Sequence, residues 1–361
     1  MKYLIAQDWI NTSNNHAGIK YLCNQMQSMY PSEFRALIIP SLESSNEKYN
    51  NLIINKIRFY KRKIKHFFYV KSIAKYLAEN LKDGDSVYLM EYMDKTFSLK
   101  KLAFELKKNF PHVKICAMAH LVPAKFDHFF MSDEEFLYWL KPIDRVITLG
   151  HSLTDYFIKR GCAREKLFTT FHYVDSYYFN DTPCRNHKKI TVIAMGNQMR
   201  NVVLLKKIVD ANPNVDFVIC QGICDMSSSF KNNDNVKLIP FVTEDELRYY
   251  MLNSDISLNV MEDTIGSNVI VTSLAMGLAM ICSDVGSIHD YCDSSNAIFC
   301  HNSDIDAFSS AISQLSTNPH LLRTMQLSSA EKAKRLSIES FVQELNLNIN
   351  TSVNFYRKIK S

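Results

Sequence analysis

A polar loop and the helix after it carry the residues of this sequence that are best suited to bind an anion. The loop follows the apolar run 256–260, and the helix begins at residues 267–269. The first turn of a helix presents backbone N–H groups without intrahelical partners and the positive end of the helix dipole. This arrangement is typical of phosphate-binding sites. The candidate ligands are Glu262, Asp263, Gly266, Ser267, Asn268 and Val269.

A second loop of this kind follows the apolar run 190–195. It contains Gly196 and Asn197, and it brings Arg200 to the start of the next helix, near Val202. A guanidinium group is always charged in proteins and binds phosphate through two parallel hydrogen bonds. Arg200 is therefore a candidate ligand of a diphosphate.

The N-terminal half of the chain repeats the arrangement. His16 and Gly18 lie between the apolar run 3–6 and the start of a helix. His120 follows directly on the strand-like run 113–119. Ligands of α/β folds bind outside the carboxyl ends of the strands, so these residues are further candidates for a binding or catalytic site.

The segment 262–286 resembles the donor-binding segment of glycosyltransferase family 4, the glycosyl transferases group 1, which have the GT-B fold. The family pattern runs E-G-F-G-x-x-x-x-E-A-M-A-x-G-x-P-V-I-x-S-D-x-G-G, and residues 273–277 and 283–286 match it as SLAMG and SDVG. The family's first glutamate falls near Asp263. Thr272 stands at the position of the second glutamate, which resembles a ribose ligand in the family. A threonine hydroxyl can form only a single, uncharged hydrogen bond with a ribose hydroxyl.

The resemblance extends to the other loops. The two cations that hold the donor diphosphate in the family correspond to Asn197 and Arg200, so one cation remains. Gly18 corresponds to a glycine that lets backbone N–H groups approach the pyrophosphate. His120 matches a histidine that faces the donor sugar. The run 144–179 resembles the segment that ends the family's N-terminal domain.

Apolar strand-like runs alternate with helical patterns along the chain, which indicates an α/β fold with parallel sheets. A length of 361 residues favours two domains. The resemblance implies two Rossmann-like domains facing a central cleft, with a C-terminal helix, 338–359, crossing back to the first. We expect an N-terminal acceptor-side domain at 1–180 plus 340–361 and a donor-binding domain at 188–339. The linker is predicted at 179–188, which is polar and turn-rich.

The composition is that of an ordinary globular protein, with 47% hydrophobic and 22% charged residues. The apolar part of the N-terminus, MKYLIAQDWINTS, is too short for a signal peptide. Nine cysteines form no C-x-x-C pair, which favours reduced core cysteines in a cytoplasmic protein over a zinc site.

The segment from Lys56 to Leu77 is basic and rich in aromatic residues. Between residues 48 and 78 there are nine Lys and Arg and no Asp or Glu. Basic amphipathic stretches of this kind bind anionic membrane surfaces. A solvated basic helix face is the alternative, whereas no other feature suggests a nucleic-acid-binding protein. The prediction is a cytoplasmic protein that is peripheral at the inner face of the cell membrane.

We therefore expect a retaining glycosyltransferase that moves a hexose from a nucleotide-diphosphate sugar, with UDP-sugars favoured, to a glycan or lipid-linked acceptor. His120 and Asp263 are the predicted catalytic residues. No metal and no cofactor beyond the nucleotide sugar is expected, because Arg200 and backbone dipoles can neutralise the diphosphate. One alternative is a GT-B nucleotide-sugar epimerase using His16, His120 and Glu91. The other is a non-catalytic nucleotide-sugar or membrane-surface binding protein.

Overall fold

The computed structural model describes residues 1–8, 16–41, 52–95, 98–180, 189–222 and 225–350. Contacts divide the chain into two units. Unit 1 comprises Met1–Leu149, Leu153–Thr170 and the residues from Val342 on, and unit 2 comprises Gly150–Ser152 and Phe171–Phe341. Among the described residues, no helix combines the length and the apolar character that crossing a bilayer requires.

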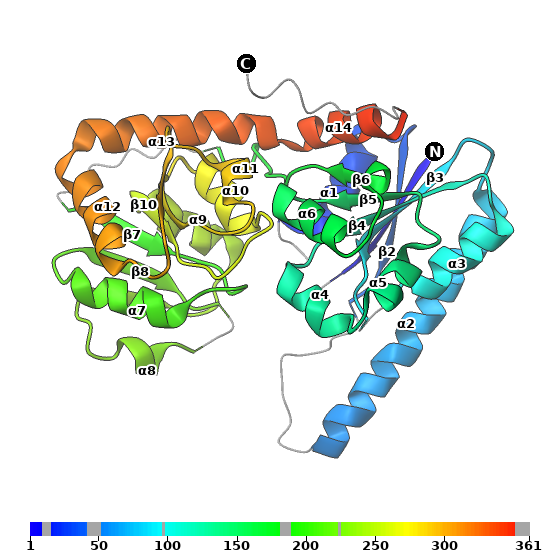
Figure 1. The fold of residues 1–361 in the computed structure, drawn as a ribbon, viewed down its shortest axis with the longest axis horizontal. Coiled ribbons are helices and arrows are strands. Elements are labelled where there is room, and N and C mark those ends of the chain that lie inside the picture. The colour runs from blue at the N-terminus through cyan, green and yellow to red at the C-terminus, as the bar shows by residue number, and fades with distance from the viewer. Residues whose placement is uncertain (9–15, 42–51, 96–97, 181–188, 223–224, 351–361) are drawn as a thin grey trace. The chain divides into compact units, whose positions relative to one another are not determined.

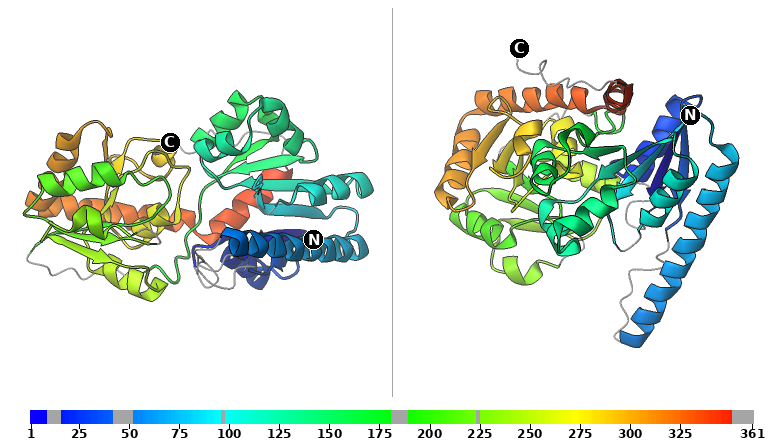
Figure 2. Two further views of the ribbon diagram at one scale, coloured as in Figure 1. Left: turned by 90° about the horizontal axis from the view of Figure 1, so that it is seen from below. Right: turned by 45° about the vertical axis from the view of Figure 1, so that its right-hand side comes forward.

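Unit 1 is built on a six-stranded parallel sheet with the strand order β2-β1-β3-β4-β5-β6 (Figure 1). The strands are β1 Lys2–Gln7, β2 Phe34–Ile39, β3 Ser86–Tyr92, β4 Lys114–Ala119, β5 Arg145–Thr148 and β6 Leu167–Thr169. The helices are α1 Ile19–Met29, α2 Leu52–Asn80, α3 Lys100–Asn109, α4 Pro123–Phe129, α5 Asp133–Leu140 and α6 His151–Lys159. Helices lie on both sides of this sheet (Figure 2), so its central strands read as continuous apolar runs.

Unit 2 contains a second six-stranded parallel sheet, with the order β12-β11-β10-β7-β8-β9. The strands are β7 Thr191–Ala194, β8 Asp216–Cys220, β9 Val236–Ile239, β10 Ile256–Asn259, β11 Ala279–Ser283 and β12 Ala297–Cys300. The helices are α7 Val202–Ala211, α8 Ser227–Phe230, α9 Glu244–Leu252, α10 Asn268–Ala275, α11 Ile288–Tyr291, α12 Ile305–Thr317 and α13 Pro319–Ala333. The last helix, α14 Ile338–Asn350, begins in unit 2 and groups with unit 1 from Val342 on.

Unit 2 has a hydrophobic core on each face of its sheet. Strand side chains alternate between the two faces, and in β7 Val192 and Ala194 pack into one core while Ile193 packs into the other. The second core also contains Ile270 and Leu274 of α10. The position of α10 is therefore fixed by burial of its apolar side against the sheet, which leaves its N-terminus at the carboxyl edge of the strands.

The strand order reverses at one point in each sheet. In unit 2 the point lies between β7 and β10, and in unit 1 it lies between β1 and β3. Connections on the two sides of such a point run in opposite directions, and this opens a crevice outside the carboxyl ends of the two strands. In unit 2 the loops after these two strands are 195–201 and 260–267. They are the two loops of the predicted donor site.

The predicted fold class is confirmed, with two parallel-sheet α/β units and a C-terminal helix whose later residues group with unit 1. The predicted helices at Ile19 and Val202 begin at those residues. Of the predicted helix 338–359, the described part ends at Asn350. The linker predicted at 179–188 lies mostly outside the described residues, and the domain boundaries stay a prediction.

Candidate functional site

The two loops at the switch point of unit 2 are joined by backbone hydrogen bonds. Arg200 and Met261 form an antiparallel β-bridge. The amide of Asn201 donates to the carbonyl of Val260 at 3.0 Å, and the amide of Glu262 donates to the carbonyl of Met199 at 2.8 Å. The two loops of the predicted donor site are therefore joined directly, although some 60 residues separate them in sequence.

The loop after β7 depends on Gly196. This residue has φ +85°, and a β-carbon placed there would lie 2.8 Å from Cγ2 of Val269, the second residue of α10. A side chain at position 196 would therefore displace the start of α10, and the backbone conformation itself is unfavourable for residues other than glycine. The structure brings Gly196 and Val269 together as candidate ligands. Asn197 extends from the same loop toward Gly222.

The N-terminus of α10 has the geometry that the sequence predicts. Ser267 is the N-cap residue, and its hydroxyl accepts the amide of Ile270 at 3.4 Å. The preceding amide groups, those of Asn268 and Val269, belong to the first helical turn and have no acceptor within the helix. They are the N–H groups that an anion would bind, with the positive end of the helix dipole behind them.

Arg200 is anchored at the carboxyl end of β8. One guanidinium nitrogen, Nη1, donates to the carbonyl of Cys220 at 3.0 Å and lies 3.6 Å from the sulfur of Met226. A guanidinium has five N–H donors in a planar fork, and this anchor involves one of its nitrogens. The bond holds the cation at the edge of the sheet where the loops 195–201 and 260–267 meet.

The two acidic candidates have different surroundings. Glu262 accepts a hydrogen bond from the side chain of Asn201, which ties it to the N-cap of α7. Asp263 accepts the amide of Thr264 at 2.7 Å, and its Oδ1 lies against the α-carbon of Gly286. Burial raises the pKa of the Asp263 carboxyl above its ordinary value, and the bond from Thr264 opposes this rise only partly. Desolvated carboxylates are common in active sites. Asp263 is therefore a stronger candidate for a site residue than Glu262.

Thr272 is 7% exposed and lies on the second turn of α10. Its hydroxyl donates to the carbonyl of Asn268 at 2.5 Å. The donor of this hydroxyl is thus used within the helix, and its oxygen is left to accept a hydrogen bond from a ligand.

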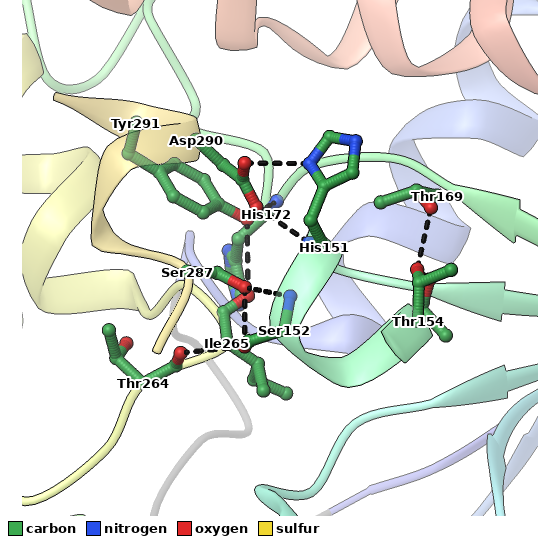
Figure 3. A network of polar contacts seen from close by, with 11 residues as sticks. His151, Ser152, Thr154, Thr169, His172, Thr264, Ile265, Ser287, Asp290 and Tyr291 are labelled. Atoms are coloured by element: carbon green, nitrogen blue, oxygen red, sulfur yellow. Dashed lines mark hydrogen bonds and ion pairs between the residues drawn. The ribbon is translucent and has the colours of Figure 1, made fainter. Parts of the chain in front are cut away.

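Tyr291 packs against the loop before α10, a contact that the sequence does not reveal. Its ring packs against Gly266, which has φ +94° and no room for a β-carbon. The phenol oxygen accepts the amide of His172 at 2.8 Å and lies 3.4 Å from the carbonyl of Ile265 (Figure 3). Tyr291 is 4% exposed. It therefore connects the segment after β6 with the loop that precedes the candidate anion site.

Asp290 of α11 and Ser287, which precedes α11, bind the start of α6, whose residues 151 and 152 belong to unit 2 (Figure 3). Asp290 accepts the backbone amide of His151 at 2.6 Å and contacts the Nδ1 atom of the same residue at 2.7 Å. The Ser287 hydroxyl accepts the amide of Ser152 at 3.0 Å. Gly150, which precedes α6, packs against Ser287 without space for a side chain. Asp290 and Ser287 thus cap the N-terminus of α6 from a distant part of the sequence.

The candidates in unit 1 lie at the carboxyl edge of their own sheet. His120 follows β4 directly, and burial lowers its pKa to about 4. Gly18 is the N-cap residue of α1, and the His16 ring packs on Tyr21 at 4.7 Å between centroids. Glu91 accepts the amide of Gln7 at 2.9 Å, which gives this carboxylate a structural contact at the end of β1.

Two Asp-x-Asp triplets occur in the sequence, at 83–85 and 304–306. Asp85 pairs with the N-terminal ammonium at 2.6 Å, and Asp304 caps α12 by accepting the amide of Ala307. Both triplets therefore have local structural contacts. Within the described residues, no group of three or more His, Cys, Asp or Glu side chains is arranged to hold a metal ion.

Comparisons with known proteins agree with this geometry. Residues 194–318 match the family model described as glycosyl transferases group 1. No curated protein sequence matches the chain. Among solved structures, sucrose-phosphate synthase from Thermosynechococcus elongatus has a TM-score of 0.72 at 11% identity, over 96% of this chain and 98% of that chain.

Two further solved structures are similar over nearly the whole chain. Anabaena HepE in complex with UDP-glucose has a TM-score of 0.70 at 12% identity, over 96% of this chain and 99% of that one. The apo form of the lipopolysaccharide outer core galactosyltransferase WaaB has a TM-score of 0.67 at 12% identity, over 97% and 99%. Residues 194–318 thus match the glycosyl transferases group 1, and the chain as a whole shares the GT-B fold of these solved structures.

Proposed function

We propose that this glycosyltransferase transfers a hexose from a UDP-sugar to a glycan or lipid-linked acceptor, with retention of the anomeric configuration. The match of residues 194–318 to group 1 supports a nucleotide sugar as the co-substrate. The preference for uridine is supported by Anabaena HepE, a structural neighbour solved with UDP and with UDP-glucose. The observation that carries the proposal is the joined pair of loops at the strand-order switch point of unit 2, where Arg200 bridges to Met261 and Gly196 lies against Val269 of α10.

In this proposal the donor diphosphate binds the amides of Asn268 and Val269, with Arg200 neutralising part of its charge. Gly18 and His16 of unit 1 are proposed as further ligands of the donor. Transfer of the hexose leaves a nucleoside diphosphate, and negative charge grows on it as the glycosidic bond breaks. Fixed donors aimed at that charge stabilise the transition state more than the ground state. We propose that these groups act without a metal ion.

The sugar would be held by the residues beside the diphosphate. Asp263, with Glu262 next to it, accepts hydrogen bonds from sugar hydroxyls, and His120 binds the sugar near the reacting carbon. A His120 pKa of about 4 keeps the imidazole neutral at physiological pH, so it can accept a hydrogen bond on one nitrogen and donate one from the other. Thr272 accepts a hydrogen bond from the ribose.

The acceptor side of the proposal rests on unit 1. We propose that the aromatic segment 124–140 forms part of the acceptor wall and that the protein works at the cytoplasmic face of a membrane. The basic helix α2 would supply the contact with anionic lipid.

The proposal is tested by thermal denaturation of the full chain with UDP, GDP, ADP and dTDP. A ligand present at about 100 times its dissociation constant stabilises the protein by about 2.7 kcal/mol. We expect UDP to give the largest shift. The variant Arg200→Gln removes the charge, and it should weaken UDP binding roughly 10- to 100-fold. Arg323→Ala, at an exposed arginine of α13, is the matched control.

The outcomes separate the proposal from its alternatives. Transfer, or slow hydrolysis, of a UDP-hexose with an α-linked product supports a retaining transferase. Conversion of one UDP-hexose into its epimer would instead identify an epimerase. Nucleotide binding that Arg200→Gln leaves unchanged would show that the diphosphate does not bind at this surface.

A further inference from the structure

Helix α2 carries large apolar side chains on a side that faces solvent. Ile57, Tyr60, Ile64, Phe67 and Phe68 are 51%, 54%, 57%, 52% and 62% exposed. Their spacing of three and four residues places all five on one face of the helix. We call these five residues the apolar stripe. A soluble helix normally turns such a face toward the core, so the stripe is the reverse of the usual arrangement.

The side of α2 that packs on unit 1 is a different one. His66 and Leu77 are 6% and 0% exposed, and at 100° per residue they lie nearly opposite the apolar stripe. Near the C-terminal end of α2, the ring of Tyr76 contacts that of Tyr3 on β1 at 6.4 Å. The helix also contacts β2 and α3. In Figures 1 and 2 its N-terminal half extends beyond the edge of the unit 1 sheet.

Lysines border the apolar stripe on both sides. By helical geometry, Lys56 and Lys63 lie along one border, and Lys61 and Lys65 lie along the other. All four are exposed. None of the ion pairs formed among the described residues involves them. No Asp or Glu occurs anywhere from residue 48 to residue 78.

We propose that α2 docks the protein on an anionic lipid surface. The apolar stripe enters the boundary between headgroups and acyl chains, and the four bordering lysines bind lipid phosphates. The long lysine side chains can keep their ammonium groups at the headgroups while their methylene groups lie in the apolar layer. This inference extends the proposed function, because it names the surface that presents a lipid-linked acceptor to unit 1.

The charge pattern favours lipid over two other partners. A second copy of the chain, paired stripe to stripe, would place four lysines from each α2 side by side with no carboxylate of that segment to compensate them, and like charges in contact are destabilising. Nucleic acid would satisfy the lysines but would leave the five apolar side chains without an apolar environment. An anionic bilayer surface accommodates both sets of side chains.

The proposal is tested by flotation of the full chain with vesicles of phosphatidylcholine, with and without 30% phosphatidylglycerol. We expect binding to the anionic vesicles only, weakening as salt screens the lysines. Replacing the four lysines by Gln should lower the affinity more than 100-fold, from roughly fivefold per lysine. The triple variant Ile57→Ser, Ile64→Ser and Phe68→Ser should lower it at least about tenfold. These positions are exposed, so the fold should survive.

A charge-matched control makes the result specific. Its four exposed lysines lie outside α2 and are likewise replaced by Gln; they are Lys159, Lys207, Lys231 and Lys334. This control should bind vesicles like the wild type. Equal loss in the control, or unchanged binding by the triple Ser variant, would overturn the proposal, as would absence of wild-type binding.

Two parallel measurements decide between the remaining partners. Sedimentation of the free protein would reveal a dimer that the triple Ser variant dissolves, and competition with single-stranded RNA would reveal tighter binding to nucleic acid; either result would overturn the proposal. UDP-induced stabilisation of the same preparations reports on the donor site separately. A failure of lipid docking is thereby distinguished from a failure of the proposed transfer function.

Discussion

The ring of Tyr291 lies against the α-carbon of Gly266, so closely that a β-carbon at position 266 would overlap the phenol. Tyr291 is itself held in place, since its oxygen accepts the amide of His172. The loop that starts the anion site thus follows the shape of a buried side chain from the next strand–helix unit. The N-terminus of α10 is positioned by this packing as well as by its own N-cap.

Gly266→Ala should therefore destabilise unit 2. The φ of +94° is unfavourable for alanine, and the methyl group would displace Tyr291. We expect a loss of roughly 2–5 kcal/mol, seen as a lower melting temperature. Gly84→Ala is the matched control, because Gly84 has φ +88° but no atom near its missing β-carbon. A Gly266→Ala effect no larger than that of the control would show that Tyr291 yields easily.

Asp263→Asn should lower activity and raise stability. Burial raises the pKa of this carboxyl, so the folded protein favours its protonated form, and keeping it ionised costs stability as the pH rises above that pKa. Asparagine keeps the shape and the acceptor for the Thr264 amide without the charge. We expect kcat/KM to fall roughly 10- to 100-fold through loss of charged hydrogen bonds to the sugar. A higher melting temperature at pH 7 should accompany this; lower stability would contradict the proposed desolvation.

His120 should make stability depend on pH in a defined window. Burial lowers its pKa from 6.5 to about 4, so between these values the unfolded chain binds a proton that the folded protein does not. Stability from this group is complete above pH 6.5 and is lost as the pH falls toward 4. Melting temperatures measured from pH 7 to pH 5 should fall less steeply in His120→Gln than in the wild type. His320→Gln, at an exposed histidine of α13, should leave the slope unchanged.

The features of this structure that depend on residues close together in the sequence could be predicted from it. Thr243 and Glu246 form a capping box, as their Thr-x-x-Glu spacing implies, and the helix predicted at residues 267–269 begins at Asn268. Strand β2 is not among the predicted elements, although its apolar run 36–39 could have identified it. The contact between Tyr291 and His172 joins residues 119 positions apart, so only the folded chain reveals it.

The candidate site likewise combines features that are local in sequence with contacts that only the folded chain reveals. Gly196 is predicted as a site residue from its position after a strand, but its contact with Val269 follows from the way α10 packs on the sheet. The anchoring of Arg200 by the Cys220 carbonyl likewise depends on the neighbouring strand β8. Residue types and spacing identified the candidate ligands, whereas their mutual distances required the sheet order. The roles of these residues in catalysis stay predictions.

Thr272→Val tests whether the hydroxyl that replaces the family's glutamate still binds the ribose. The Thr272 hydroxyl donates to the Asn268 carbonyl, so only its lone pairs are left for a ligand. The substitution therefore removes one neutral hydrogen bond to the ribose. We expect UDP affinity to fall roughly 2- to 13-fold, with stability almost unchanged because valine has the same shape. Thr324→Val removes an equivalent hydroxyl, bonded to the His320 carbonyl on α13, and should leave UDP affinity unchanged. If Thr272→Val binds UDP like the wild type, the ribose is held by other groups, and the missing glutamate has no substitute at this position.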